Sequence, residues 1–362
     1  MGSGDEVIVP GFMWISSISA IIRARAIPVL VDSDQTLGVD PEDLKVKISE
    51  RTKVIMVVPM LGGSSKIGEI MEVVRNVNNS RKKKNLSKIF VLEDCAQSLG
   101  AHAFGIPGSS QASLPEGCYK LGTFGDIGTF SLQLNKDITA GEGGMVVTRD
   151  KELNDRVDAL HNAGYIKKEK NNINWYGDIP YGWGHGRRMS ELQGAVARVQ
   201  LKKLDTILDT IRKNHSFFEE FFKKQGIKLR KRAYQNNPGD TGYYLCFHLP
   251  ENLDDNTAIS KGREIAKDLK DKGFNVWFLH DFEVHIYYNI EPLVKKFPMN
   301  DGSPWEDPKN SFHTQYKYDR GALPNLDHLL IRTIGLNMPS KMSDNTRDNM
   351  MNDLLVTLKN LY

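Results

Sequence analysis

A single lysine, Lys136, lies between an apolar run and a glycine-rich turn. This position predicts that Lys136 takes part in a chemical reaction as a nucleophile. The run GTFSLQL, residues 128–134, is typical of a strand, and the turn GEGG follows at residues 141–144. A lysine amine held at a strand end is partly desolvated, which lowers its pKa and makes it a better nucleophile. Most lysines are exposed and solvated, so this interpretation depends on the residues that lie beside Lys136.

Asp94 is the second candidate, because it ends the strand-like run IFVLED. A lysine and a carboxylate on neighbouring strand ends suit pyridoxal phosphate. This cofactor forms a Schiff base with a lysine and needs a carboxylate to keep its ring nitrogen protonated. From spacing alone, an equally good interpretation of Asp94 is an N-cap for the following CAQS segment.

Strand-like and helix-like segments alternate through the first half of the chain, which predicts a mostly parallel sheet. Strands are predicted at 6–10, 28–34, 53–60, 89–94 and 145–148, and helices at 15–23, 41–50, 68–76 and 151–162. The strand at 53–60 is nearly unbroken in its apolar residues, so helices are expected on both faces of the sheet. Ligands bind beyond the carboxyl ends of such strands, the edge at which Asp94 and Lys136 are both expected.

The second half of the chain changes character. Residues 165–188 lack periodicity and predict a long functional or interface loop, whereas residues 190–222 have helical spacing and suit two helices or one bent helix. Further strand-like and helix-like segments follow. We therefore predict an α/β domain over residues 1–215, with helices on both faces of its sheet, and a smaller α+β domain over residues 216–362.

The composition is that of a soluble globular protein. Of 362 residues, 40% are hydrophobic and 26% are charged, and a net charge of +3 is too small to indicate a nucleic-acid partner. The basic run at residues 81–84 is expected to be a solvated face. The apolar region at residues 7–32 contains arginines and prolines, so no membrane partner is expected. Three distant cysteines predict no metal site and a reducing, cytoplasmic location.

Four segments occur in the order of one family. They are DEVIVPGFMWISSISAIIRARAIPVLVDSD, VLEDCAQSLGA, GTFGDIGTFSLQLNKDITAGEGGMVVT and RRMSELQGAVARVQLKKLD. The sequence resembles the DegT/StrS family of pyridoxal-phosphate-dependent sugar aminotransferases, which implies the fold type I aminotransferase architecture. The resemblance covers residues 4–215 well and the remainder loosely. GEGG alone would fit any tight turn, but its combination with EDCAQ and FSLQLNK is specific.

The resemblance implies roles for five residues. Lys136 matches the Schiff-base lysine, and Asp94 matches the aspartate that pairs with the ring nitrogen. Gln97 matches a residue near the ring hydroxyl, and Ser131 matches a serine that binds the cofactor phosphate. Trp14 matches an aromatic residue that stacks on the ring, although a core tryptophan is the simpler interpretation without the family.

The implied reaction transfers an amino group from glutamate or glutamine to a keto sugar, with Lys136 moving a proton as general base and acid. Nucleotide-linked keto sugars, keto-octulosonates and keto-cyclitols are the candidate substrates. A dehydratase branch has histidine in place of the lysine, so Lys136 favours transamination. The family also implies a homodimer with active sites at its interface. A non-catalytic or regulatory homologue with impaired cofactor binding, and a pyridoxal-phosphate-dependent sugar dehydratase, remain as alternatives.

Two departures from the family pattern concern the cofactor phosphate. The resemblance implies an additional segment before the GDEV run, with a helix start that cradles the phosphate, so a truncated family member is expected. Gly186 replaces an asparagine that usually reaches the phosphate of the neighbouring subunit, and His185 or Arg187 is the candidate substitute. In the second domain, His285 and Tyr287 are candidates for a sugar site, with a half-buried domain edge as the alternative.

Overall fold

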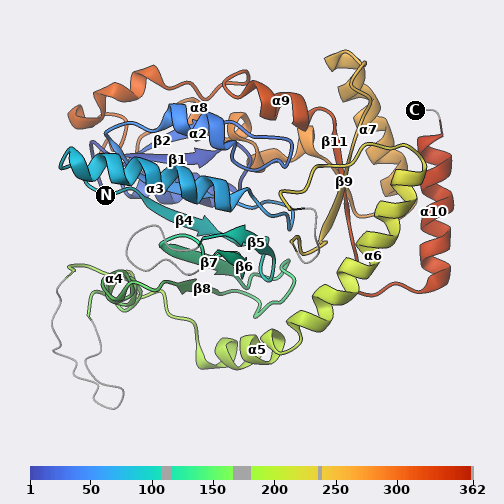
Figure 1. Ribbon diagram of the computed structural model, residues 1–362, viewed down its shortest axis with the longest axis horizontal. Coiled ribbons are helices and arrows are strands. Elements are labelled where there is room, and N and C mark those ends of the chain that lie inside the picture. Colours follow the sequence, from blue (N-terminus) through green and yellow to red (C-terminus); the bar gives the residue numbers. More distant parts are fainter. Residues whose placement is uncertain (107–115, 166–180, 235–238, 360–362) are drawn as a thin grey trace.

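A central sheet of six strands forms the core of the computed structural model, which describes residues 1–106, 116–165, 181–234 and 239–359 (Figure 1). The strand order is β2-β1-β3-β4-β7-β8. The strands are β1 (Glu6–Pro10), β2 (Ile27–Val31), β3 (Thr52–Val57), β4 (Phe90–Asp94), β7 (Ile127–Ser131) and β8 (Gly144–Val147). All neighbours pair in parallel except β7 and β8. The prediction of an α/β fold with a mostly parallel sheet is confirmed.

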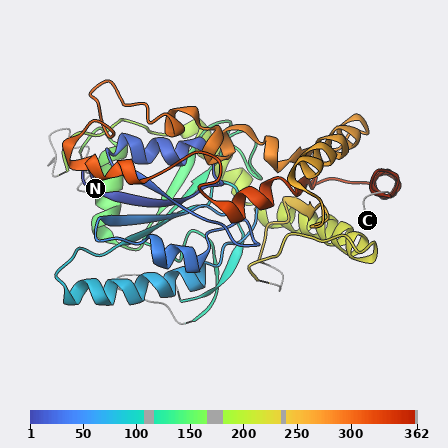
Figure 2. The same ribbon diagram turned by 90° about the horizontal axis from the view of Figure 1, so that it is seen from above.

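Helices cover both faces of this sheet (Figure 2). The helices on one face are α2 (Pro41–Lys47) and α3 (Ile67–Lys83), and those on the other are α1 (Ile15–Arg23), α8 (Glu291–Val294) and α9 (Pro324–Leu330). Strand β1 contributes to both cores, because successive side chains of a strand point to opposite faces. Val7 and Val9 pack in the core beneath α1, whereas Ile8 packs beneath α3. This two-sided burial explains why the strand is apolar from Val7 to Pro10.

Local signals account for the first helices. Helix α1 has the predicted bounds, and α2 begins after Asp40, whose side chain accepts a hydrogen bond from Glu42 N at 2.9 Å. Helix α3 extends past the predicted end because Arg81 is buried on it rather than solvated. The Arg81 guanidinium donates to the carbonyl oxygens of Ser87, Ser49 and Glu50, at 2.7 to 3.0 Å. The expectation of a solvated face is therefore wrong for this residue.

A second sheet of three antiparallel strands, in the order β10-β11-β9, lies beside the first (Figure 1). It consists of β9 (Tyr244–His248), β10 (Val276–Phe278) and β11 (Thr333–Asn337), and it packs with α6 (Leu204–Lys224), α7 (Asp255–Asp271) and α10 (Asp344–Leu358). Helices α5 (Glu191–Leu201) and α6 lead from the large sheet to the small one, as the alternative of two helices predicted.

The chain returns to the large sheet between β10 and β11. Leu293, Trp305 and Leu326 belong to the same core cluster as strand β1, and the Tyr318 hydroxyl donates to Pro28 O at 2.7 Å. A division into domains at residue 215 stays a prediction, and any division has to assign residues 286–331 to the core of the large sheet.

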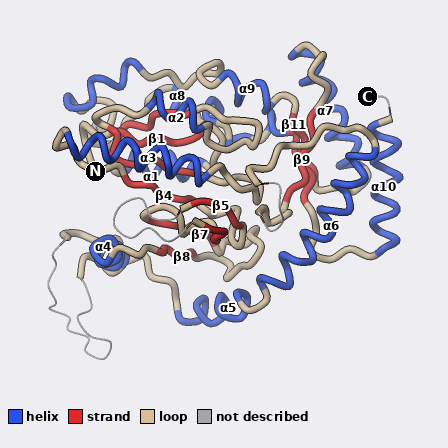
Figure 3. The backbone as a smooth tube through the Cα atoms, viewed as in Figure 1, coloured by secondary structure: helices blue, strands red, loops and turns tan. Residues whose placement is uncertain are grey.

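The remaining elements are short and lie around these two sheets (Figure 3). They are the hairpin of β5 (His102–Gly105) and β6 (Gly117–Lys120), the helix α4 (Lys151–His161), and the 3-10 helices η1 (Leu279–Asp281), η2 (Glu283–His285), η3 (Tyr287–Asn289) and η4 (Pro308–Gln315). Among the helices of the described ranges, none has the length and apolar character needed to cross a membrane.

Candidate functional site

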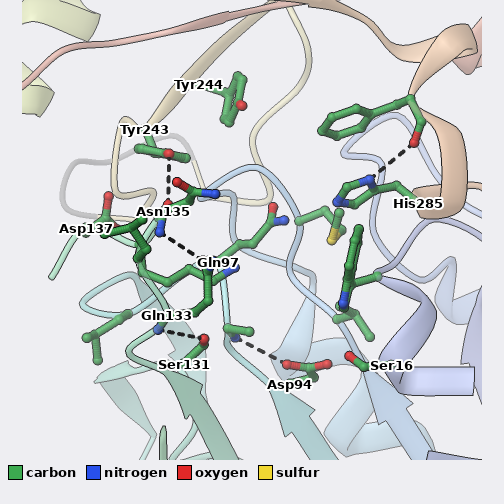
Figure 4. A pocket seen from close by; sticks show the side chains of 18 of the residues that line it. Ser16, Asp94, Gln97, Ser131, Gln133, Asn135, Asp137, Tyr243, Tyr244 and His285 are labelled. Atoms are coloured by element: carbon green, nitrogen blue, oxygen red, sulfur yellow. Dashed lines mark hydrogen bonds between the residues drawn. The ribbon is translucent and has the colours of Figure 1, made fainter. Parts of the chain in front are cut away.

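The carboxyl ends of β4 and β7 open onto a cavity of about 900 Å³ (Figure 4). Asp94 ends β4 and Ser131 ends β7, and these two strands are hydrogen-bonded neighbours. Elements from the second half of the chain, including Tyr243 and Trp277, complete the cavity wall. Six of the predicted site residues line this cavity, namely Trp14, Asp94, Gln97, Ser131, Lys136 and His285.

Lys136 lies in the loop after β7 rather than at the strand end itself. The loop turns back on itself, because Leu132 N donates to Gly143 O and Ala140 N donates to Leu132 O, each at 2.9 Å. Gly143 has a φ of +144°, and a Cβ there would lie 2.5 Å from Met189 Sδ, so glycine is required at this position. Burial lowers the pKa of Lys136, while the carboxylates of Asp94 and Asp137 raise it to a smaller extent.

The lowered pKa gives a testable pH dependence. We expect the rate at which Lys136 captures a small aldehyde to reach half its maximum below pH 10.5, the ordinary lysine value, because burial favours the neutral amine. Replacing Asp137 with asparagine is expected to lower this midpoint further, since a carboxylate that favours the ammonium form is removed. A midpoint equal to that of the exposed Lys151 would contradict the burial effect. Both midpoints are measured by quantitative peptide mapping after reductive trapping.

Asp94 is held from two sides at the floor of the cavity. Its Oδ2 accepts a hydrogen bond from Ser17 Oγ at 2.9 Å, and its Oδ1 accepts one from Ala96 N at 3.3 Å. Both interpretations of Asp94 are therefore compatible, since it caps the turn after β4 and also lines the cavity. Ser17 is a buried residue of α1, so the first helix fixes the carboxylate. Sequence spacing contained no signal for this contact.

Within the part of the chain that the structure describes, Gln97 and Ser131 each accept one hydrogen bond from a backbone N–H, and their own donors have no partner. Leu61 N donates to Gln97 Oε1 at 3.0 Å. Gln133 N donates to Ser131 Oγ at 3.3 Å (Figure 4). The amide nitrogen of Gln97 and the hydroxyl hydrogen of Ser131 are consequently the groups with which these cavity residues can contact a ligand.

Trp14 and His285 lie next to each other in the cavity wall. Trp14 is 46% exposed, so the interpretation as a core tryptophan is wrong. The His285 ring lies 4.7 Å from the Trp14 ring and stacks on Phe282 at 4.0 Å between centroids. Backbone hydrogen bonds position it, because Met13 N donates to His285 O at 3.0 Å. Burial lowers the pKa of His285 to about 4, with a smaller contribution from Lys136, so the imidazole is neutral at neutral pH.

The other three predicted residues lie elsewhere. Tyr287 is fully buried, and its hydroxyl donates to the Asp327 carboxylate at 3.0 Å, so it is a core residue and not a sugar contact. Its partner lies 40 residues later, which no local pattern reveals. His185 and Arg187 are exposed on the segment before α5, and Gly186 between them has a φ of +63°. Neither side chain lines the cavity within the described residues.

Glu93, which sequence reasoning missed, positions the loop before β7. Its carboxylate is fully buried and accepts hydrogen bonds from Gly122 N, Phe124 N and Gly125 N at 2.7 to 2.8 Å. Burial raises the pKa of Glu93, and the three N–H groups oppose this rise. The alternating direction of side chains along β4 sends Glu93 into this loop while Asp94 lines the cavity.

Replacing Glu93 with alanine is expected to lower the free energy of unfolding by about 3–5 kcal/mol, because three buried N–H groups lose their acceptor. Urea denaturation followed by circular dichroism measures this change. Glu93→Gln, which keeps one acceptor oxygen, should lie between the wild type and Glu93→Ala. Equal stability of the alanine variant and the wild type would show that the loop is held by other contacts.

Comparisons with known proteins agree with this geometry. The model of the DegT/DnrJ/EryC1/StrS aminotransferase family matches residues 1–297. The L-glutamine:2-deoxy-scyllo-inosose aminotransferase of Streptomyces lividus is 30% identical over 258 residues, which cover 69% of this chain and 54% of that protein. The GDP-perosamine synthase of Escherichia coli O157:H7 is 37% identical over 209 residues, 58% of this chain and 49% of that protein. The chain thus matches about half the length of these relatives.

The fold has close counterparts among solved structures. The pyridoxal-phosphate form of Spr1654 from Streptococcus pneumoniae has a TM-score of 0.72 and is 20% identical, with 100% of this chain and 82% of that chain covered. At this identity the likeness shows the fold, which is that of fold type I aminotransferases. The family model, in contrast, extends over most of the sequence and includes the residues from Trp14 to Lys136 that line the cavity. The chain belongs to the DegT/DnrJ/EryC1/StrS aminotransferase family.

Proposed function

We propose that this chain transfers an amino group from glutamate or glutamine to a keto sugar or keto-cyclitol, with pyridoxal phosphate as cofactor. The observation that carries this proposal is the position of Lys136 and Asp94 on the wall of one cavity, beyond the carboxyl ends of neighbouring parallel strands. The names of two relatives, a 2-deoxy-scyllo-inosose aminotransferase and a GDP-perosamine synthase, support this substrate class.

The residues of the cavity fit the cofactor that aminotransferases of this family use. A half-buried lysine with a lowered pKa suits attachment of the aldehyde. Asp94 offers a carboxylate whose hydrogen bonds with the described residues come from a hydroxyl and a backbone N–H. Trp14 presents a half-exposed aromatic face, which suits a planar ring. Hydrogen-bond donors on Gln97 and Ser131 complete a set with the chemistry of a pyridine ring that carries a hydroxyl and a phosphate.

The proposed roles follow from these donors and acceptors. When bound, pyridoxal phosphate supplies an electron sink for negative charge that develops at the reacting carbon. Asp94 holds the proton of the ring nitrogen, and Ser17 keeps its carboxylate in place. The amine of Lys136, whose pKa burial lowers, would accept a proton from the reacting carbon of the substrate and donate it to the aldehyde carbon of the cofactor, as general base and acid. Trp14, half-exposed in the cavity wall, would cover one face of the ring and exclude water from it.

We further propose a homodimer. Helix α5 has no buried residue although it carries Leu192, Val196 and Val199, which are 81%, 48% and 52% exposed. An apolar helix face of this kind supports contact with a second subunit. His185 and Arg187 precede this helix, so we retain them as candidates for contacts to the phosphate or substrate of the partner subunit. Light scattering would test the dimer.

The three free thiols support a reducing, cytoplasmic location.

A direct assay tests the proposed reaction. The protein, loaded with pyridoxal phosphate, is incubated with a panel of keto substrates (2-deoxy-scyllo-inosose, a GDP-linked keto sugar and a keto-octulosonate), each with glutamate and with glutamine. We expect an amino product, detected by its mass, from one substrate class in the presence of one donor. Cofactor binding without any amino product across the panel would contradict the proposed substrate class. Absence of cofactor binding would instead favour a non-catalytic homologue.

A further inference from the structure

Asp137, the residue after Lys136, lies on one wall of the cavity together with Asn135 and Tyr243 (Figure 4). Asp94 lies across the cavity from this wall (Figure 4). The Oδ1 atom of Asp137 is buried, and it accepts no hydrogen bond from any residue that the structure describes. A buried carboxylate oxygen without a donor costs free energy, so this atom marks a position that a hydrogen-bond donor from a ligand would satisfy.

The neighbours of Asp137 use their donors elsewhere. The Arg212 guanidinium, on α6, donates to Asp240 O and to Gly100 O, each at 3.0 Å. The Tyr243 hydroxyl donates to Asn135 O at 3.3 Å. Burial raises the pKa of Asp137 to about 7, and the positive charges of Lys136 and Arg212 oppose the rise without cancelling it. Among the described residues, none therefore donates a hydrogen bond to Oδ1 of this carboxyl group in the cavity.

The charges around the cavity restrict what this donor can be. Its lining includes the carboxylates of Asp94, Asp137 and Glu142, whereas the described lining residues include one lysine, Lys136, and no arginine. A phosphate or carboxylate group of a ligand would be repelled at this wall. The amino group of an amino donor is transferred in the reaction, so it does not remain bound to Asp137. A hydroxyl group is neutral, donates one hydrogen bond and persists through the reaction.

We propose that Asp137 forms a subsite for a ring hydroxyl of the sugar or cyclitol substrate, with Oδ1 accepting its hydrogen bond. This inference rests on the proposed function, and it adds a specificity-determining residue to it. Lys136 and Asp137 are adjacent in sequence, so the same loop that carries the reacting amine also orients the ring of the substrate. A substrate that lacks the hydroxyl would leave Oδ1 unsatisfied and would be discriminated against.

Two measurements test the subsite with the full-length protein loaded with cofactor. In the first, the two half-reactions are followed separately by the absorbance of the cofactor. At a pH well above 7, where Asp137 is ionised, Asp137→Ala is expected to raise the KM of the keto substrate roughly 10–100-fold, the loss of one hydrogen bond to a charged acceptor. The KM of the amino donor should change by less than about twofold, although loss of this carboxylate lowers the pKa of Lys136 and so changes the rate of proton transfer in both half-reactions. Asp137→Asn keeps an acceptor oxygen and should recover part of the loss. Glu264→Ala, which removes an exposed carboxylate on α7 outside the cavity lining, serves as the matched control and should change KM by less than about twofold.

The second measurement does not require turnover. Calorimetric titration with myo-inositol, a polyol that has no keto group, should show weaker binding to Asp137→Ala than to the wild type by the same factor. Equal affinity of the two proteins for the polyol, or an effect of Asp137→Ala confined to the donor half-reaction, would overturn the hydroxyl subsite. If the wild type forms no adduct with pyridoxal phosphate, the proposed function fails, and the titration still decides the subsite.

Discussion

Lys136→Ala is expected to abolish transamination, with a loss in kcat of at least roughly 10⁴-fold. The reason is that one amine both captures the aldehyde and moves the proton at the reacting carbon, and the described lining of the cavity contains no second lysine. The variant should fold normally, because burial disfavours the charged form of Lys136 in the native state. The measurements are steady-state kinetics and the visible absorbance of the bound cofactor.

A matched control separates this effect from general loss of charge. Lys151 is exposed at the start of α4 and pairs with Asp155 at 2.6 Å, so Lys151→Ala should leave kcat within about twofold. Added methylamine should restore part of the activity of Lys136→Ala, because a free amine can enter the space that the side chain leaves. Substantial activity of Lys136→Ala without added amine would refute the assignment of this lysine.

Asp94→Asn is expected to lower kcat roughly 10²–10³-fold, the usual effect of removing one preorganised electrostatic contact. The amide keeps the size of the carboxylate and can still accept the hydrogen bond of Ser17, but it cannot hold the ring proton by its charge. The cofactor should therefore still bind, with a shifted absorbance maximum, while proton transfer becomes slow. Single-turnover kinetics with the amino donor measure this step.

Ser17→Ala tests how far the position of the carboxylate contributes. This change removes the hydrogen bond to Asp94 Oδ2 but leaves the charge. Its effect on kcat should be roughly tenfold, because a hydrogen bond to a charged group contributes about 1.5 kcal/mol at the low end. An effect of Ser17→Ala as large as that of Asp94→Asn would mean that orientation, rather than charge, dominates. Unchanged kcat in Asp94→Asn would contradict the role of Asp94.

The sequence predicted those features that depend on local pattern. Alternating strands and helices predicted the parallel sheet, and apolar runs that end in Asp94 and before Lys136 predicted the edge at which the cavity lies. This succeeded because the carboxyl ends of parallel strands necessarily share one edge of the sheet. The N-cap at Asp40 was predictable because it is local: its partner, Glu42 N, is two residues away.

Contacts between distant segments were not predictable. Tyr287 lies in a polar and aromatic segment that suggested a sugar site, but its partner Asp327 makes it part of the core. Arg81 lies in a basic run, yet its guanidinium donates to carbonyl oxygens of two loops, at Ser49 and Glu50 and at Ser87. Glu93 is one residue before the predicted Asp94, and nothing in the sequence shows that its carboxylate organises a loop 29 to 32 residues later.

Reduction of the wild-type protein with borohydride in the presence of pyridoxal phosphate, followed by peptide mapping, tests the central assignment most directly. The reduced cofactor is expected on the peptide that contains Lys136 and to be absent when Lys136 is replaced by alanine. Attachment at a different lysine, or attachment that is equal in the wild type and in Lys136→Ala, would contradict the proposed active site.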